Sequence, residues 1–340
     1  MTVLAVMLLV TWRVGPGKLM NVEGFEGIAR SWPLTPLPPE QAYVLRQALG
    51  QALYSALGWA STGRFLALHL AALLVSGLVL AGWLLRRLGV QRGAIAVCLL
   101  VASPITAVLL EWIGMYDAFS VFVWVLLLLT LGRHPLLQAG VAILGGIQNF
   151  EQFAVSIVLL ALLPELTRGQ GMRARPVALA IGAILGKVAL ELYLRSAGAA
   201  SGSRASFLSD TAMQHLVLTS FALLAPVIVW TVLGGLWAPL LRRLPDVWTS
   251  APRALRVRGL LAAALVLGIG IISADHTRVM VLISFPLVVL LCVRLALEET
   301  SVSAWLRRPD TWVLLVTPAF VIVSGNTPLP LGVDPFLVGL

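Results

Sequence analysis

Long apolar runs separated by short polar stretches make up most of this chain of 340 residues. A helix needs about 20 apolar residues to cross the hydrocarbon core of a membrane. The pattern predicts an all-α integral membrane protein, with about eleven transmembrane helices in one polytopic domain over residues 1–340. The predicted spans are residues 1–12, 65–85, 93–112, 118–132, 136–148, 152–164, 177–196, 213–241, 259–274, 279–297 and 312–325.

Some of these segments are too short for a plain crossing. The neighbouring spans 118–132, 136–148 and 152–164 predict tilted helices or one re-entrant segment. The first span is also short, so an upstream start codon stays an alternative to Met1.

Residues 13–64 form the one sizeable loop on the predicted outer side. Beyond its prolines, the segment QAYVLRQALGQALYSALGW repeats apolar residues near helical spacing. It predicts an amphipathic helix at the outer interface, with Tyr54 and Trp59 as anchors at headgroup level.

Composition agrees with a membrane protein, since 59% of residues are hydrophobic and 11% are charged. Soluble domains carry about 25% charged residues. The net charge of +9 does not indicate nucleic-acid binding, because the arginines cluster in short loops between apolar runs. Most of these loops are cytoplasmic if the N-terminus is inside, as the positive-inside rule expects. Cys98 and Cys292 lie in apolar runs and predict no disulfide framework.

The same topology places several carboxylates at the outer ends of spans, where acids are costly and often functional. Glu23 and Glu26 follow the first span and would share a helix face, either one suited to act as a general base. Solvated loop acids are the alternative. Glu111 and Asp117 flank the turn that contains Tyr116, and Asp117 is alternatively a helix-capping acid.

Two further polar clusters interrupt the apolar pattern. Asn149, Glu151 and Gln152 follow a Gly-Gly pair, where a simple turn is the alternative to a functional site. Asp275, His276 and Arg278 are nearly consecutive. Arginine suits a phosphate partner, although Asp275 and Arg278 are spaced to pair with each other.

Lys187, Glu191 and Arg195 form a stripe on one face of the span 177–196. An intramembrane Lys–Glu pair is one interpretation of this stripe, and a cationic track that holds a lipid phosphate is the other.

Five short motifs follow one another along the chain: Glu23-Gly24-Phe25, Tyr43-Val44-Leu45-Arg46, Gly114-Met115-Tyr116-Asp117, Glu151-Gln152 and Asp275-His276-Thr277-Arg278. In this order they resemble the GT-C superfamily of polytopic glycosyltransferases, in its bacterial form that uses polyprenyl-phosphate sugars. The chain departs from the family pattern at two points: both acids of the first loop are Glu where the family is Asp-rich, and Gln47 follows Arg46 where Pro is expected.

The resemblance implies an inverting hexosyl- or pentosyltransferase of the cell envelope. It would sit in a bacterial inner membrane, with a cytoplasmic N-terminus and an outward-facing site. The donor would be a polyprenyl-phosphate-linked sugar within the lipid bilayer, and the acceptor an unidentified glycan, lipid or protein. No nucleic acid is involved.

The resemblance also implies roles for individual residues. Glu23, or next Glu26, would be the catalytic base, and Arg46 and Arg278 would hold the phosphate. The other substrate-binding candidates are Tyr43, Glu111, Tyr116, Asp117, Asn149, Glu151, Gln152, Asp275 and His276. Mg²⁺ or Mn²⁺ would suit the acids, although the sequence does not require a metal.

Two other classes of protein remain open. A multi-pass transporter or lipid-linked sugar flippase would use Lys187 and Glu191 within the membrane, but no internal repeat supports it. A non-catalytic membrane scaffold would need none of the outer acids.

Overall fold

The computed structural model describes residues 22–37, 42–168, 171–199, 211–273, 275–316, 321–324 and 327–330. Two compact units emerge from the packing of the chain. Unit 1 contains residues 79–111 and the described residues after 215, and unit 2 contains residues 22–78 and 112–215. The helix α4 (Thr62–Leu88) begins in unit 2 and ends in unit 1.

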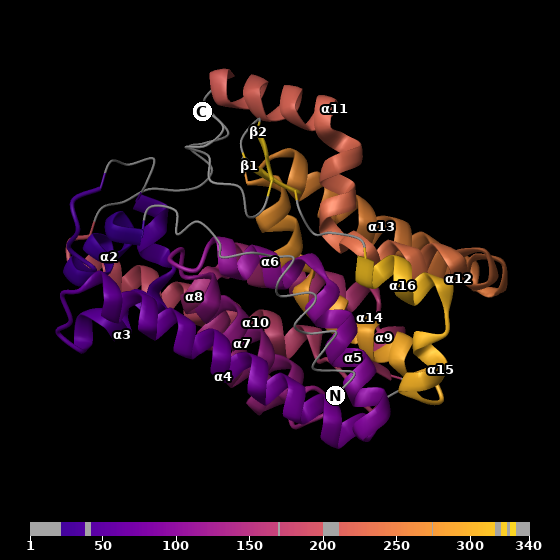
Figure 1. The fold of residues 1–340 in the computed structure, drawn as a ribbon. Helices are drawn as coiled ribbons and strands as arrows, with labels where there is room; N and C mark the ends of the chain where they lie inside the picture. The colour runs from indigo at the N-terminus through magenta and orange to yellow at the C-terminus, as the bar shows by residue number, and fades with distance from the viewer. Residues whose placement is uncertain are drawn as a thin grey trace. The chain divides into compact units, whose positions relative to one another are not determined.

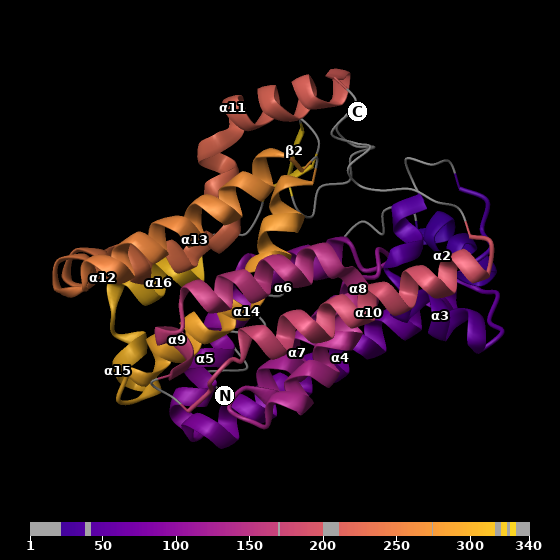
Figure 2. The same cartoon turned by 180° about the vertical axis from the view of Figure 1, so that it is seen from behind.

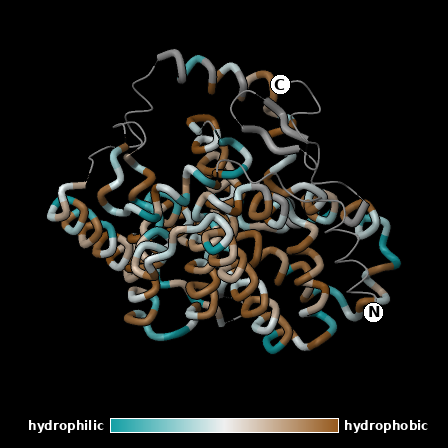
Figure 3. The backbone as a smooth tube through the Cα atoms, turned by 60° about the vertical axis from the view of Figure 1, so that its left-hand side comes forward, coloured by the Kyte–Doolittle hydropathy of each residue, from teal (hydrophilic) through white to brown (hydrophobic). Residues whose placement is uncertain are grey.

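Six helical segments of the described chain are long and apolar enough to cross a membrane. Figure 3 shows the apolar residues along the helices and most of the polar ones near helix ends. The chain is therefore a helical, multi-pass membrane protein. The segments are Thr62–Leu88, Pro135–Leu162, Pro176–Ser196, Phe221–Asp246, Arg253–Ile271 and His276–Leu297.

The prediction of about eleven spans is not confirmed. Residues 1–12 lie outside the described residues, and 93–112 is divided between α5 (Val90–Ala102) and α6 (Pro104–Glu111). The two helices meet at a 56° bend and make a seventh span if counted as one. Pro104 explains the break, because proline disfavours a helical conformation in the residue before it.

The prediction of a helix over residues 312–325 is wrong. The helix α16 (Pro309–Val316) ends early, and β1 (Val321–Ser324) pairs with the antiparallel strand β2 (Thr327–Pro330). β1 is the sequence Val-Ile-Val-Ser, and β-branched residues fit a strand at least as well as a helix.

Unit 2 has a layer of short helical elements at the end where the long helix α4 begins. This layer consists of α2 (Val22–Ser31), the 3₁₀ helix η1 (Ala42–Arg46) and α3 (Ala48–Ala56). The remaining helices are α7 (Asp117–Thr130), α8 (Pro135–Leu162), α9 (Glu165–Arg168) and α10 (Pro176–Ser196). In Figures 1 and 2, α7, α8 and α10 lie side by side.

The helix α8 folds back on itself at Asn149, whose φ of −166° and ψ of 83° are not helical. A Cβ on Gly145 would collide with the ring of Phe153. Eight residues of straight helix rise about 12 Å, which is too far for that contact. The limbs on either side of Asn149 correspond to the predicted segments 136–148 and 152–164 and to the polar turn between them.

The first limb of α8 packs against α10 without room for side chains between the backbones. Added Cβ atoms on Gly182 and Gly186 would collide with the carbonyl oxygens of Ala139 and Ile143. The contacts advance together along both helices, so the helices run parallel. Glycines four residues apart permit this close approach of membrane helices.

In unit 1, α14 (His276–Leu297) supplies much of the core, and it packs against α5 and against α13 (Arg253–Ile271). Thr277 of α14 shares a hydrogen bond of 2.8 Å with Thr231. The other elements of this unit are α11 (Thr211–Leu233, in unit 1 from residue 216 on), η3 (Gly234–Leu236), α12 (Trp237–Ser250) and α15 (Val302–Leu306).

Candidate functional site

The residues predicted to form a site divide between the two units. Unit 2 holds Glu23, Glu26, Tyr43, Arg46, Tyr116, Asp117, Asn149, Glu151 and Gln152. Unit 1 holds Glu111, the last residue of α6, together with Asp275, His276 and Arg278.

Within unit 2, the structure brings the predicted residues to one end. Gln148, just before the turn of α8, donates from Nε2 to the carbonyl of Tyr116 at 3.0 Å. Its Oε1 accepts from the backbone N–H of Leu49 in α3 at 3.1 Å. Gln148 thus holds together the start of α7, the turn of α8 and the start of α3. We call this region the α3 end of unit 2.

Glu23 and Glu26 lie on α2 at this end, and their environments differ. Glu23 is exposed, whereas Glu26 is only 5% exposed. The Oη of Tyr54 donates to Glu26 Oε1 at 2.9 Å, and Arg30 lies 3.6 Å from the other carboxylate oxygen. Of the two acids, Glu23 is the one that solvent and a substrate can reach.

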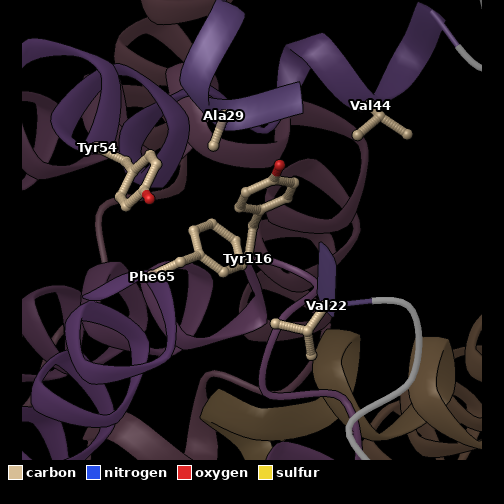
Figure 4. Packing of buried hydrophobic residues seen from close by; sticks show 6 residues of the cluster. All are labelled: Val22, Ala29, Val44, Tyr54, Phe65 and Tyr116. Carbon is tan, nitrogen blue, oxygen red and sulfur yellow. The ribbon is translucent and has the colours of Figure 1, made fainter. Parts of the chain in front are cut away.

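Aromatic side chains fix α2 to α3, α4 and α7. Figure 4 shows the rings of Tyr54, Phe65 and Tyr116 gathered below Ala29. Phe65 is edge-on to both tyrosines, with ring centroids 5.3 and 5.9 Å apart. Tyr116 Oη donates to the carbonyl of Phe25 at 2.6 Å.

Tyr54 is therefore a core residue, and its prediction as a headgroup anchor is wrong. Amphipathic spacing identifies an apolar face but does not tell whether lipid or protein covers it. Burial raises the pKa of the Tyr54 phenol, and its hydrogen bond to Glu26 adds to this effect.

Four charged side chains connect η1, α8 and α10. Arg46 donates from Nε and Nη2 to the two oxygens of Glu191, at 2.6 and 2.9 Å. Lys187 Nζ lies 3.1 Å from Glu191 and 3.2 Å from Glu151. For the predicted stripe of Lys187, Glu191 and Arg195 on α10, the structure thus contains the Lys–Glu pair. The charge of Arg46 is balanced by Glu191, so a phosphate at Arg46 must compete with that carboxylate.

Asp117 is the first residue of α7 and is only 1% exposed. It is an acid of the first helical turn, where the helix dipole stabilises a negative charge, and the N-cap residue is Tyr116. Tyr116 before it has a positive φ of 65°. Tyr43 is half-buried and packs against the aromatic cluster of Figure 4.

At the turn of α8, Asn149 Oδ1 accepts from the backbone N–H of Gln152 at 3.3 Å, which is N-cap geometry. Glu151 points outward, with a side chain 49% exposed, whereas Asn149 and Gln152 are buried. Glu151 is thus the accessible acid of this turn.

In unit 1, Arg278 Nη1 donates to Asp275 Oδ2 at 3.0 Å, so the expected alternative of mutual pairing is what the structure contains. Arg278 is only 6% exposed and His276 is fully buried. A ring nitrogen of His276 lies 2.6 Å from the carbonyl of Gly270. His276 therefore packs inside unit 1.

The sequence reasoning missed Gln148 as the connector of this end, and Tyr54 as the partner of Glu26. Gln148 is a polar residue at the end of an apolar limb, which was the available signal. Among the described residues, no group of three or more His, Cys, Asp or Glu is arranged to hold a metal ion. The acids that the structure describes are therefore not grouped as the suggested Mg²⁺ or Mn²⁺ site would require.

Comparison of the whole chain with known proteins gives no match to a protein-family model, to a curated protein or to a solved structure.

Proposed function

We propose that this protein is a membrane glycosyltransferase of the GT-C type, which moves a sugar from a polyprenyl-phosphate donor to an acceptor on the extracytoplasmic side. One observation carries the proposal: the exposed acid Glu23 lies on a helix that buried contacts hold in place, at the α3 end of unit 2. Asp117, Glu151 and Arg46 lie at the same end. In this proposal the N-terminus is in the cytoplasm of a bacterium.

The proposed reaction is a direct displacement. An acceptor hydroxyl oxygen attacks the anomeric carbon as Glu23 takes its proton, and the bond from that carbon to the phosphate oxygen breaks. Polyprenyl phosphate leaves with the bonding electrons, and the anomeric centre inverts. A positioned carboxylate base contributes about 10²- to 10⁴-fold to such a step.

The other charged residues would bind the substrates. The anionic phosphate needs nearby cations, and Lys187 and Arg46 supply them in unit 2, with Arg278 as the candidate in unit 1. Glu151 is exposed enough to accept hydrogen bonds from sugar hydroxyls.

The test is transfer of a radiolabelled sugar from polyprenyl phosphate in membranes that contain Glu23→Gln, Glu26→Gln or Arg278→Ala. We expect Glu23→Gln to lose at least about 100-fold in rate while it keeps the wild-type unfolding midpoint. Glu26→Gln is the matched control, because it should act through stability. Full activity of both Glu23→Gln and Arg278→Ala would contradict the assigned roles.

A second candidate is a proton-coupled transporter or sugar-lipid flippase, which the Arg46–Glu191–Lys187–Glu151 network at the spanning helix α10 favours. It predicts substrate movement across proteoliposome membranes that a pH gradient drives and Lys187→Met abolishes. A scaffold, as the third candidate, predicts that Glu23→Gln changes neither transfer nor transport.

A further inference from the structure

Three buried polar atoms at the turn of α8 have no hydrogen-bond partner among the described residues: Trp124 Nε1, Asn149 Nδ2 and Gln152 Oε1. The residues are 1%, 5% and 3% exposed. Leaving such an atom without a partner destabilises the folded state. Three in one place indicate a missing common partner, since buried polar groups are nearly always bonded.

The three residues line the same small cavity between α7 and α8. Ser120, Gln148 and Phe153 contribute to its wall. The free space in it is at the lower limit of what one water molecule needs.

The donors and acceptors around this cavity match a water molecule. The indole N–H of Trp124 can only donate. Asn149 must present its amide N–H groups, because its carbonyl oxygen already accepts from Gln152 N. Gln152 offers a carbonyl oxygen as acceptor. A water accepts two hydrogen bonds and donates one here, whereas an anion would face the Gln152 oxygen and a cation would face two N–H groups.

We propose that one buried water molecule occupies this cavity, bonded to Trp124, Asn149 and Gln152, and that it positions the turn of α8. The turn carries Glu151, whose carboxylate lies 3.2 Å from Lys187. By tying the turn to Trp124 on α7, the water fixes where Glu151 projects. These three residues are positioning residues, and this role does not depend on which reaction or transport the protein performs.

The direct test is an experimental structure of the wild-type protein at a resolution that shows ordered water. We expect one density peak within hydrogen-bonding distance of Trp124 Nε1, Asn149 Nδ2 and Gln152 Oε1. An empty cavity, or side chains turned to bond one another, would overturn the proposal.

A double-mutant cycle tests for the same water through its effect on the unfolding midpoint. Trp124→Phe removes the N–H and leaves a smaller aromatic ring against Phe153, and Gln152→Met removes the acceptor with little change in volume. If one water serves both, the second substitution lowers the unfolding midpoint much less in the presence of the first than alone.

The control cycle pairs Trp124→Phe with Thr130→Val, which breaks a separate hydrogen bond on α7. That pair should be additive. Equal additivity in both cycles would contradict a shared water. If the double variant fails to fold, the wild-type structure decides alone.

Discussion

Arg46 and Glu191, 145 residues apart in sequence, meet in a two-pronged ion pair with bonds of 2.6 and 2.9 Å. Both side chains are largely shielded, at 14% and 23% exposure. The pair fastens η1 to the spanning helix α10, so the layer that carries the candidate base depends on it.

Glu191→Gln keeps the shape of this side chain but leaves Arg46 and Lys187 without their shared anion. We expect the free energy of unfolding to fall by about 1–3 kcal/mol, read as a lower thermal midpoint in detergent. Arg46→Lys should not behave as a conservative change, because an ammonium group cannot bind both oxygens in the same plane. Arg195→Ala, at an exposed position of α10, is the control and should leave the midpoint unchanged.

Tyr54 should ionise only above its ordinary pKa of 10.0, because burial and Glu26 favour the neutral phenol in the folded state. Its contribution to stability is then complete below pH 10.0 and lost as the pH rises through the higher folded-state pKa. Burial raises the pKa of Tyr116 as well.

The measurement is the phenolate absorbance during alkaline titration of the folded protein. Tyr54→Phe should remove absorbance only from the part of the curve above pH 10.0. Loss of signal below that pH in this variant would show that the phenol is not held neutral.

Gly186→Ala places a methyl group against the carbonyl oxygen of Ile143 and should force α8 and α10 apart. We expect a loss of about 1–3 kcal/mol, typical of overpacking. Gly140→Ala is the matched control, because a Cβ at Gly140 meets nothing within 4 Å. It should be neutral, or stabilising by up to about 1 kcal/mol through helix propensity. Equal effects of the two substitutions would contradict close packing at Gly186.

Asp310 in unit 1 belongs to a second ion cluster, in which it pairs with Arg242 and Arg308. Burial alone would raise its pKa, but Arg308 and Arg242 outweigh that effect and lower it below the ordinary 3.8. The stabilisation is therefore present above pH 3.8 and lost as the pH falls through the folded-state pKa.

Asp310→Asn should lower the unfolding free energy by about 1 kcal/mol near neutral pH. The difference from wild type should shrink in acid below pH 3.8. A difference that stays constant down to lower pH would mean that the charge of Asp310 is not the cause.

Much of unit 2 could be predicted from sequence because its helices follow apolar runs. The limbs of α8 and the polar turn between them were predicted, since Gly145, Gly146 and Asn149 interrupt the apolar pattern. The sequence also placed Asp117, Glu151 and Arg46 on one side of the membrane, because successive helices reverse direction, and the structure has them at the α3 end of unit 2.

Pairings across long sequence distances could not be predicted. Nothing in the local spacing around Arg46 indicates Glu191 as its partner, and nothing around Tyr54 indicates Glu26. The burial of Arg278 and His276 was missed for a similar reason: a polar cluster between two apolar runs looks solvent-facing until the packing of both neighbouring helices is known.

The fold-back of α8 has a consequence for depth in the bilayer. The helix α7 has 14 residues and a length of about 21 Å, whereas α10 has 21 residues and a length of about 31 Å. Only α10 matches a hydrocarbon core of about 30 Å. The α2–α3 layer rests on the turn of α8 through Leu49 and Gln148, and it lies alongside the last turns of α10, where Trp32 stacks on Tyr193. A molecule anchored by a hydrocarbon tail can reach this layer from the side, with its tail still among the lipids.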